Sequence, residues 1–496
     1  MNISFYCILL TVILQHTAFA QDGFVVKAGE PNFLSMPQDM VITPDNSMIF
    51  LFTSIQASEP LYINEIRKLN PVGDITNTFT YADTANNYVE YTHCLLVEDT
   101  LYVFGWGYRD PITYESFLLM QKLDLQLNLI NTTQIRTEQI DPYGAAHGQV
   151  KYVNGKFYCV NNYGDATSQA AFYAEISKEG DLLKLKADSL EGYLHYVYDF
   201  IVEPNNGGFR LYSLSMYNPA IPGIFGTIDF YNEEFIREDF YIMPYDFLNF
   251  FTHTAANDSI YYISGQRMDW IANDGWRAGF MKMKNDTTLL NALIYSTTPD
   301  SMACPAYRHS IEVLPDGNII FCFNILSSQM FPTPYPGKIN LMKLTPDLEV
   351  IWHRYIGEPN TKYDAYEVHT TSSDEIVILG AYSLAPYVNS WDMQALFIKT
   401  NSEGIITGTN DEPSGVRSTQ AIVYPNPAAD FVQIEFSMAY TQATFSLLDI
   451  SGKTVFEKLL TANKQNLDIS GIPAGTYIYR VYNQKGLDES GKLMVE

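Results

Sequence analysis

Long apolar runs are nearly absent from this sequence, and the exception lies at its start. The segment Ile8–Leu14 is a short apolar core, and Ala18-Phe19-Ala20 follows it as a small-x-small motif. This order is typical of a signal peptide that is cleaved before Gln21. A transmembrane anchor is the alternative, but the run is well below the ~20 residues that a helical span needs. The sequence therefore predicts a signal peptide at residues 1–20 and no membrane segment in the mature chain.

Cysteine is also scarce, with four residues remaining after position 20: Cys94, Cys159, Cys304 and Cys322. Their irregular spacing matches no zinc-binding pattern. Export permits disulfides, yet Cys304 and Cys322 do not face each other around the Pro315-Asp316-Gly317 turn. We therefore expect buried free thiols, with a disulfide as the open alternative.

Positive charge is the third shortage. The chain has 30 Lys and Arg against 56 Asp and Glu, which gives a net charge of −26. A field of this sign repels phosphate backbones and anionic membranes. Nucleic acid is therefore excluded as a partner. The charge is interpreted as solubility outside the cell, with cation binding as the alternative.

Catalytic motifs are missing as well. The sequence contains no nucleophile elbow, HExxH pair, P-loop or EF-hand loop, so it identifies no reaction by pattern. We assign no catalytic residue, no cofactor and no metal site from motifs.

What the chain does contain is a repeat. One element occurs seven times and consists of an extended run, a polar turn and a strongly apolar strand, as in Met40–Phe52 and Ile311–Phe323. The turns fall at near-regular intervals, at Asp45, Asp99, Asn154, Asn206, Asp258, Asp316 and Asp374. A second hairpin follows each copy, for example around Lys68–Asp74. Two hairpins per repeat indicate a four-stranded antiparallel unit.

Seven such units without helices between them predict an all-β fold, a seven-bladed β-propeller over residues 21–405. An array of β-sandwiches is the alternative. The repeats match no propeller family that has a named activity.

Several polar residues share one position in this repeat. Gln38, His93, His147, Asp199 and His309 each lie six or seven residues before the first turn of their unit. His253 and His369 lie five residues before theirs, and His195 lies eleven before. Because the first strand of each blade lines the central channel, we expect these side chains at the channel mouth. They could bind a ligand or a metal, or act as general acid and base; alternatively, they bridge neighbouring blades by hydrogen bonds.

Tryptophans form a second candidate site. Trp106, Trp270, Trp276 and Trp391 are expected in loops that join second to third strands. Exposed rings among carboxylates suit a glycan or peptide ligand. The alternative is that the rings pack over the tops of the blades.

The composition changes after the repeats. Residues 406–420 are a polar segment that we interpret as a linker. From 421 onward the alternating runs Phe431–Phe436, Thr444–Asp449 and Thr476–Tyr482 predict a compact C-terminal β-sandwich over 421–496.

Short motifs follow one another in order through this last segment. It opens with Val423-Tyr-Pro-Asn-Pro-Ala-Ala-Asp430, continues with Leu448-Asp-Ile-Ser-Gly-Lys-Thr-Val455, and ends with Pro473-Ala-Gly-Thr-Tyr477 and Gly491-Lys492. The residues that carry the pattern are Tyr424, Pro425, Asn426, Pro427, Asp430, Asp449, Gly452, Gly475, Tyr477, Gly491 and Lys492.

In these motifs the segment resembles the type A C-terminal sorting domain of type IX secretion substrates. The resemblance covers about 75 residues and implies export in a Gram-negative bacterium, through the type IX translocon, to the cell surface or the medium. It also implies a sortase-like peptidase that cuts within the linker. The ending Met494-Val-Glu496 departs from the basic ending common in the family.

Together these features predict an exported binding module for a glycan or a protein. A secreted hydrolase or lyase that uses the channel-mouth His and Asp residues is one alternative. A scaffold without a small ligand is the other.

Overall fold

The computed structural model describes residues 23–28, 33–56, 62–82, 88–108, 116–136, 149–164, 169–188, 194–203, 208–218, 221–243, 247–255, 259–268, 276–285, 287–295, 301–327, 337–357, 361–384, 393–406, 421–424, 428–436, 443–449, 453–462, 464–482 and 488–495. The predicted signal peptide and residues 407–420 of the predicted linker lie outside these ranges. Every regular element within them is a β-strand. Among the described residues, no helix is long and apolar enough to cross a membrane.

The strands before residue 401 form antiparallel sheets of four, except that one parallel bridge, between Gln169 and Leu194, joins two of them into an eight-stranded sheet and that one sheet has five strands. The β2–β5 group contains β2 (Phe33–Ile42), β3 (Met48–Gln56), β4 (Tyr62–Leu69) and β5 (Ile75–Tyr81). The β6–β9 group contains β6 (Tyr88–Val97), β7 (Thr100–Tyr108), β8 (Ser116–Leu123) and β9 (Leu129–Arg136). The β10–β13 group contains β10 (Gln149–Val153), β11 (Lys156–Gly164), β12 (Gln169–Ser177) and β13 (Leu182–Ala187). The β14–β17 group contains β14 (Leu194–Val202), β15 (Phe209–Asn218), β16 (Ile221–Tyr231) and β17 (Arg237–Ile242).

The remaining groups follow the same plan. The β18–β21 group contains β18 (Phe247–Ala255), β19 (Ile260–Met268), β20 (Trp276–Lys284) and β21 (Thr288–Ile294). In the β22–β26 group the first strand is split into β22 (Ser301–Pro305) and β23 (Ile311–Val313), followed by β24 (Ile319–Ser327), β25 (Lys338–Leu344) and β26 (Val350–Ile356). The last group contains β27 (Thr361–Thr370), β28 (Ile376–Leu384), β29 (Gln394–Thr400) and, from the other end of the chain, β1 (Phe24–Ala28).

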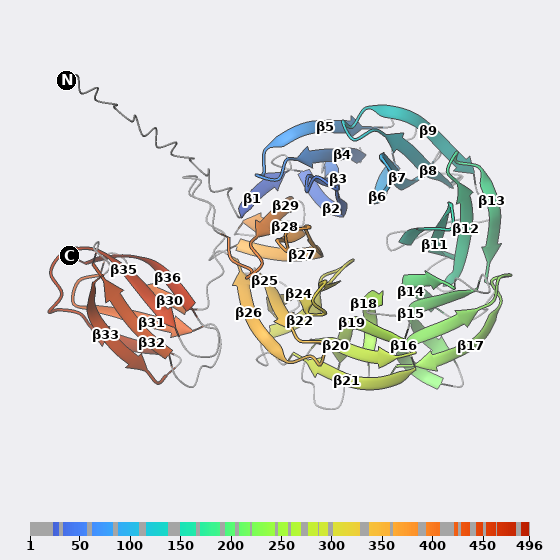
Figure 1. Ribbon diagram of the computed structural model, residues 1–496. Helices are drawn as coiled ribbons and strands as arrows, with labels where there is room; N and C mark the ends of the chain where they lie inside the picture. Colours follow the sequence, from blue (N-terminus) through green and yellow to red (C-terminus); the bar gives the residue numbers. More distant parts are fainter. Residues whose placement is uncertain are drawn as a thin grey trace, which may run out of the picture.

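These groups stand around a ring, with the first strand of each toward the centre and the fourth toward the rim (Figure 1). Each repeated sequence element is the hairpin between the first and second strands of one group. The ring closes where β1 pairs with β29, so that one sheet takes strands from both ends of this region. The prediction of an all-β propeller fold is confirmed.

The hydrophobic core is divided among the interfaces between neighbouring groups. Phe24 and Phe397 from the closing sheet pack with Phe50 and Phe52 of β3. Trp106 and Phe104 of β7 pack in the same way against Phe172 of the β10–β13 group. Each sheet buries both faces against its neighbours, which explains why second strands contain continuous apolar runs such as Met48–Phe52 of β3 and Ile376–Leu379 of β28.

In most groups the turn between the third and fourth strands has the same hydrogen-bonding pattern. The first turn residue, Asn70 for example, accepts hydrogen bonds from the N–H groups two and four residues later. The same arrangement is made by Asp124, Ser177, Asn232 and Thr345 in their hairpins, and by Asn401 in the turn that follows β29. The residue three positions on takes a positive φ, of 99° at Gly73 and 67° at Leu348. Leu348 is buried, so burial of its side chain offsets the cost of that backbone conformation.

The four cysteines after residue 20 are buried free thiols, as expected. Burial raises the pKa of Cys159, Cys304 and Cys322. They therefore act as small apolar side chains and not as reactive thiolates.

The C-terminal segment folds into two sheets. One contains β30 (Ala421–Tyr424), β31 (Phe431–Phe436) and β34 (Lys464–Asp468). The other contains β32 (Ala443–Leu448), β33 (Thr454–Leu460), β35 (Gly475–Tyr482) and β36 (Asp488–Val495). Val432 and Ile434 from the first sheet share one core with Phe445, Tyr479 and Val481 from the second. The predicted compact β-sandwich is confirmed.

A buried histidine on β26 makes stability depend on pH. His353 is surrounded by the rings of Tyr295, Phe323 and Tyr355, and its Nε2 lies 3.1 Å from Asn340 Oδ1. Burial, together with the nearby Arg354, lowers the pKa of His353 to about 3. The unfolded chain takes up this proton near pH 6.5, so the folded state loses stability as the pH falls from 6.5 toward 3, by about 1.4 kcal/mol per pH unit.

We therefore expect His353→Gln to flatten the acid side of the stability profile. Between pH 7 and pH 5 the variant should lose about 2 kcal/mol less unfolding free energy than the original chain. Urea denaturation at the two pH values measures the difference. Equal losses in the two proteins would show that His353 does not control this dependence.

Candidate functional site

The first strands of the groups carry a bulge at a shared position. The register against the second strand shifts by one residue between Pro37 and Asp39, and again between Tyr91 and His93. Corresponding shifts precede Asp199, Thr252 and Glu367. In the β22–β26 group the break is larger, and Arg308 and His309 lie between β22 and β23. A bulge re-aims the side chains beside it, so each of these groups presents one residue at a matching place.

Glycines opposite two of the bulges make room for them. Gly105 pairs with Tyr91, and Gly380 pairs with Ala365. A Cβ at Gly105 would lie 2.6 Å from the Glu90 carbonyl oxygen, and one at Gly380 would lie 2.6 Å from the Asp364 carbonyl oxygen. Any side chain there would displace the bulge, so these glycines help to position His93 and Glu367.

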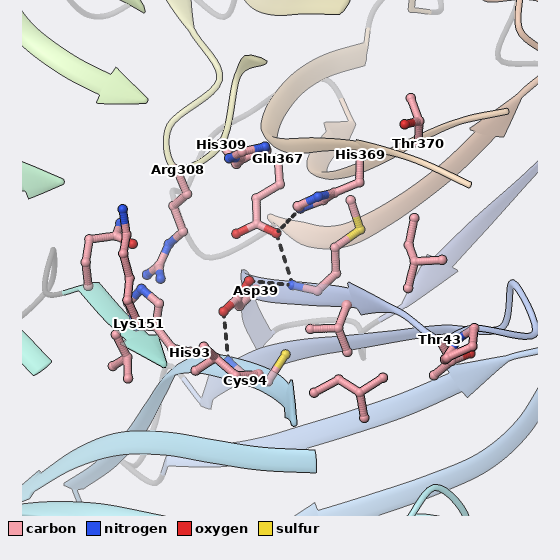
Figure 2. A pocket seen from close by; sticks show the side chains of 18 of the residues that line it. Asp39, Thr43, His93, Cys94, Lys151, Arg308, His309, Glu367, His369 and Thr370 are labelled. Atoms are coloured by element: carbon pink, nitrogen blue, oxygen red, sulfur yellow. Dashed lines mark hydrogen bonds and ion pairs between the residues drawn. The ribbon is translucent and has the colours of Figure 1, made fainter. Parts of the chain in front are cut away.

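The re-aimed residues line a cavity of about 750 Å³. It runs from the bulges along β2, β6, β10 and β27 toward the hairpins at Thr43, Asn46 and Ser372. Its polar lining includes Asp39, His93, Lys151, Asp199, Arg308, His309, Glu367 and His369, several of which Figure 2 shows converging from different groups.

Two carboxyl groups meet in this cavity. The Met40 N–H donates to Asp39 Oδ1 at 2.8 Å and to Glu367 Oε2 at 3.0 Å. The Cys94 N–H donates to Asp39 Oδ2 at 2.8 Å. Burial and the neighbouring Glu367 charge raise the pKa of Asp39 well above its ordinary value, and burial raises the pKa of Glu367 to about 6. Burial and mutual repulsion thus disfavour two negative charges at this place, and of the two groups Asp39 is the one pushed toward its protonated form.

Arg308 reaches across the channel to two other groups. Its Nη1 donates to the Thr92 carbonyl at 2.6 Å, and its Nη2 donates to Gln38 Oε1 at 2.6 Å. Gln38 in turn donates to Glu90 Oε1 at 2.8 Å. The predicted residue Gln38 is therefore buried and holds the guanidinium in place.

His93 and Asp199 occupy different electrostatic environments. Burial, followed by the charge of Arg308, lowers the pKa of His93 well below its ordinary value, so its ring is neutral. Its Nδ1 is buried and has no hydrogen-bond partner among the described residues. Asp199 Oδ1 lies 2.6 Å from Lys151 Nζ, in a pair that reaches the cavity wall.

His309 and His369 lie together at another part of the wall. Their rings stack with centroids 4.6 Å apart. His309 Nε2 lies 3.1 Å from Glu312 Oε2, and His369 Nδ1 lies 3.9 Å from the same oxygen. His369 Nε2 faces Glu367 Oε2 at 3.5 Å. Although burial opposes it, the hydrogen bond from His309 lowers the pKa of Glu312.

The structure thus brings His93, Asp199 and His309 to one cavity, together with His369. His147, Trp270 and Trp391 lie outside the described residues. The backbones of His195 and His253 belong to β14 and β18. Trp276 is the first residue of β20 and pairs with Met268, so it is not part of the loop in which it was predicted.

The predicted loop position of Trp106 is wrong. Trp106 lies within β7, is 7% exposed, and packs edge-on against Phe172. The reason is alternation along the strand, because Tyr102, Phe104 and Trp106 share the face that packs on the β10–β13 group. Trp106 therefore belongs to the core and does not contribute to an exposed aromatic surface.

Sequence reasoning missed Asp39, Glu367, Arg308 and Glu312. A usable signal existed for two of them, since Asp39 lies six residues before Asp45 and Glu367 seven before Asp374. These are the spacings that identified His93 and Asp199. In the last unit the prediction instead chose the nearby histidine, His369.

Residues of the predicted sorting motif lie on the C-terminal sandwich. Tyr424 ends β30, Gly475 begins β35, and Gly491 and Lys492 belong to β36. The Tyr477 hydroxyl donates to the Pro473 carbonyl at 2.8 Å. The Asp430 carbonyl accepts from Ile469 N–H, and Asp449 Oδ1 accepts from Lys453 N–H at 3.1 Å. Pro425, Asn426, Pro427 and Gly452 lie outside the described residues.

Comparison with known families identifies this segment. Residues 422–496 match the model of the secretion system C-terminal sorting domain. No curated protein matches the chain.

Two solved structures illustrate the likeness of the larger region. One is the β-propeller domain of the Trilobed protease from Pyrococcus furiosus, which is 9% identical to this chain and superposes with a TM-score of 0.42. The match covers 78% of this chain and 99% of the protease domain. The other is an α-L-arabinofuranosidase from Fusarium graminearum, which is 12% identical and has a TM-score of 0.39. That match covers 76% of this chain and 98% of the arabinofuranosidase chain. Because both TM-scores are below 0.5, these likenesses carry no argument about this chain.

Proposed function

We propose that the propeller is an extracellular binding module whose central cavity takes the end of a glycan. The premise is that the chain is a type IX secretion substrate with a β-propeller-like fold. The observation that carries the proposal is the cavity itself. It is concave, is lined by polar groups held from several strands, and has a volume of about 750 Å³, within the range of small-ligand sites.

The lining suits a ligand rich in hydroxyl groups. Lys151 and Arg308 supply donors, while Asp199 and Glu367 supply acceptors. A hydroxyl both donates and accepts, so a sugar can satisfy both kinds of group. The net charge of −26 favours neutral over polyanionic glycans.

The route of the protein completes the proposal. Residues 1–20 direct the chain across the inner membrane, and the sorting domain then directs it through the outer membrane. A sortase-like peptidase cuts within 406–420, leaving the propeller at the surface of a Gram-negative bacterium or in the medium. Catalysis by the channel-mouth residues and a pure scaffold role stay predictions.

A glycan array probed with the full-length chain tests the proposal. We expect binding to a related set of neutral glycans that share one terminal unit. Absence of binding across the array would remove the proposed function. Turnover of a bound glycan would favour the hydrolase or lyase instead.

A further inference from the structure

We propose that His309, Glu312 and His369 form a binding site for a divalent transition-metal ion such as zinc, at the wall of the central cavity. Two imidazoles and one carboxylate are a donor set that zinc accepts. The inference goes beyond glycan binding and does not depend on it.

The spacing of the three donor atoms supports the proposal. Ligand atoms about 2.1 Å from a tetrahedrally coordinated zinc ion lie roughly 3.4 Å from one another. The Glu312 oxygen lies 3.1 Å from His309 Nε2 and 3.9 Å from His369 Nδ1, on either side of that value. All three donor atoms lie within 4.8 Å of one another. Small side-chain movements would therefore suffice to coordinate an ion.

The backbone holds the two histidines side by side. The His309 N–H donates to the Tyr366 carbonyl at 3.1 Å, and the Val368 N–H donates to the His309 carbonyl at 2.8 Å. Glu312 is held in β23, which pairs with β24. The ligands thus come from two neighbouring groups whose contact is already fixed, which reduces the cost of ordering them on binding.

A second carboxylate orients the His369 ring. His369 Nε2 has no hydrogen-bond partner that meets ordinary geometry among the described residues, but Glu367 Oε2 lies 3.5 Å away. A carboxylate behind a metal-bound imidazole is a common supporting arrangement, because it fixes the ring and its tautomer. Glu367 is in this sense a positioning residue.

The site is also accessible. The side chains of His309, Glu312 and His369 are 27–29% exposed, and both histidines line the cavity. Three protein ligands leave at least one coordination position for water or another ligand.

Zinc binding to the full chain tests the inference. After treatment with a chelator, the protein is titrated with zinc alone, in competition with a chromogenic chelator. We expect one ion per chain in this site, and binding more than about 100-fold weaker in the double variant His309→Gln/His369→Gln. The matched control is His93→Gln, which removes an imidazole from the same cavity and should bind as the original chain does.

A second variant covers the case in which the double variant does not fold. Glu312→Gln keeps the size of the side chain and removes its charge, and it should also weaken zinc binding. Circular dichroism confirms that each tested protein is folded. The inference fails if the original chain binds no zinc, or if folded Glu312→Gln and the double variant bind it as tightly as the original chain.

Discussion

Deletion of residues 421–496 should stop export at the outer membrane. The chain would then accumulate in the periplasm of a host that carries a type IX translocon, and the extracellular and surface fractions should fall to background. The expectation follows from the match of residues 422–496 to the secretion system C-terminal sorting domain, a segment that has its own hydrophobic core. Immunoblotting of separated cell fractions measures the effect.

The control for this deletion is the substitution Lys178→Gln in the propeller. Lys178 pairs with Glu98, whose side chain is 79% exposed, so little stability should be lost and export should continue. Normal surface delivery of the truncated chain would contradict the role given to the C-terminal domain.

Phe24→Ala should strongly destabilise the propeller. Phe24 is 4% exposed, and its ring centroid lies 6.0 Å from that of Phe397. The ring also packs against Gly73, in the turn of the neighbouring β2–β5 group. The substitution leaves a cavity at the sheet in which β1 pairs with β29 and closes the propeller. We therefore expect a loss of about 3–5 kcal/mol in unfolding free energy. Urea denaturation measures this loss.

Phe240→Ala provides the matched control for Phe24. Phe240 lies on the rim strand β17 and is 46% exposed. The same atoms are removed, but little buried contact is lost, so the cost should stay below about 1 kcal/mol. Similar losses in the two variants would contradict the role of β1 as the closing strand.

The fold could be predicted because its signals are local and repeated. The turns at Asp45, Asp316 and Asp374 each join two strands of alternating or continuous apolar character, and hairpin formation follows from neighbouring residues. Closure of the ring by β1 was not predicted, because pairing of Phe24 with Lys399 joins distant parts of the chain and leaves no local signal.

The site was predicted only in part. The repeat spacing identified His93 and Asp199, because bulges at matching positions aim these residues alike. The same spacing applied to Asp39 and Glu367, but their pairing depends on how the ring closes. The reach of Arg308 to Thr92 and Gln38 follows from three-dimensional packing, which spacing does not encode.

The central claim is that the cavity holds the ligand, and blocking its rim tests that most directly. Ser372 is exposed and lines the cavity, whereas the exposed neighbour Ser373 does not. A glycan found on the array is titrated calorimetrically into the original chain, Ser372→Trp and Ser373→Trp. The account predicts at least about tenfold weaker binding for Ser372→Trp and unchanged binding for Ser373→Trp. Unchanged binding by Ser372→Trp, or equal losses in both variants, would contradict it.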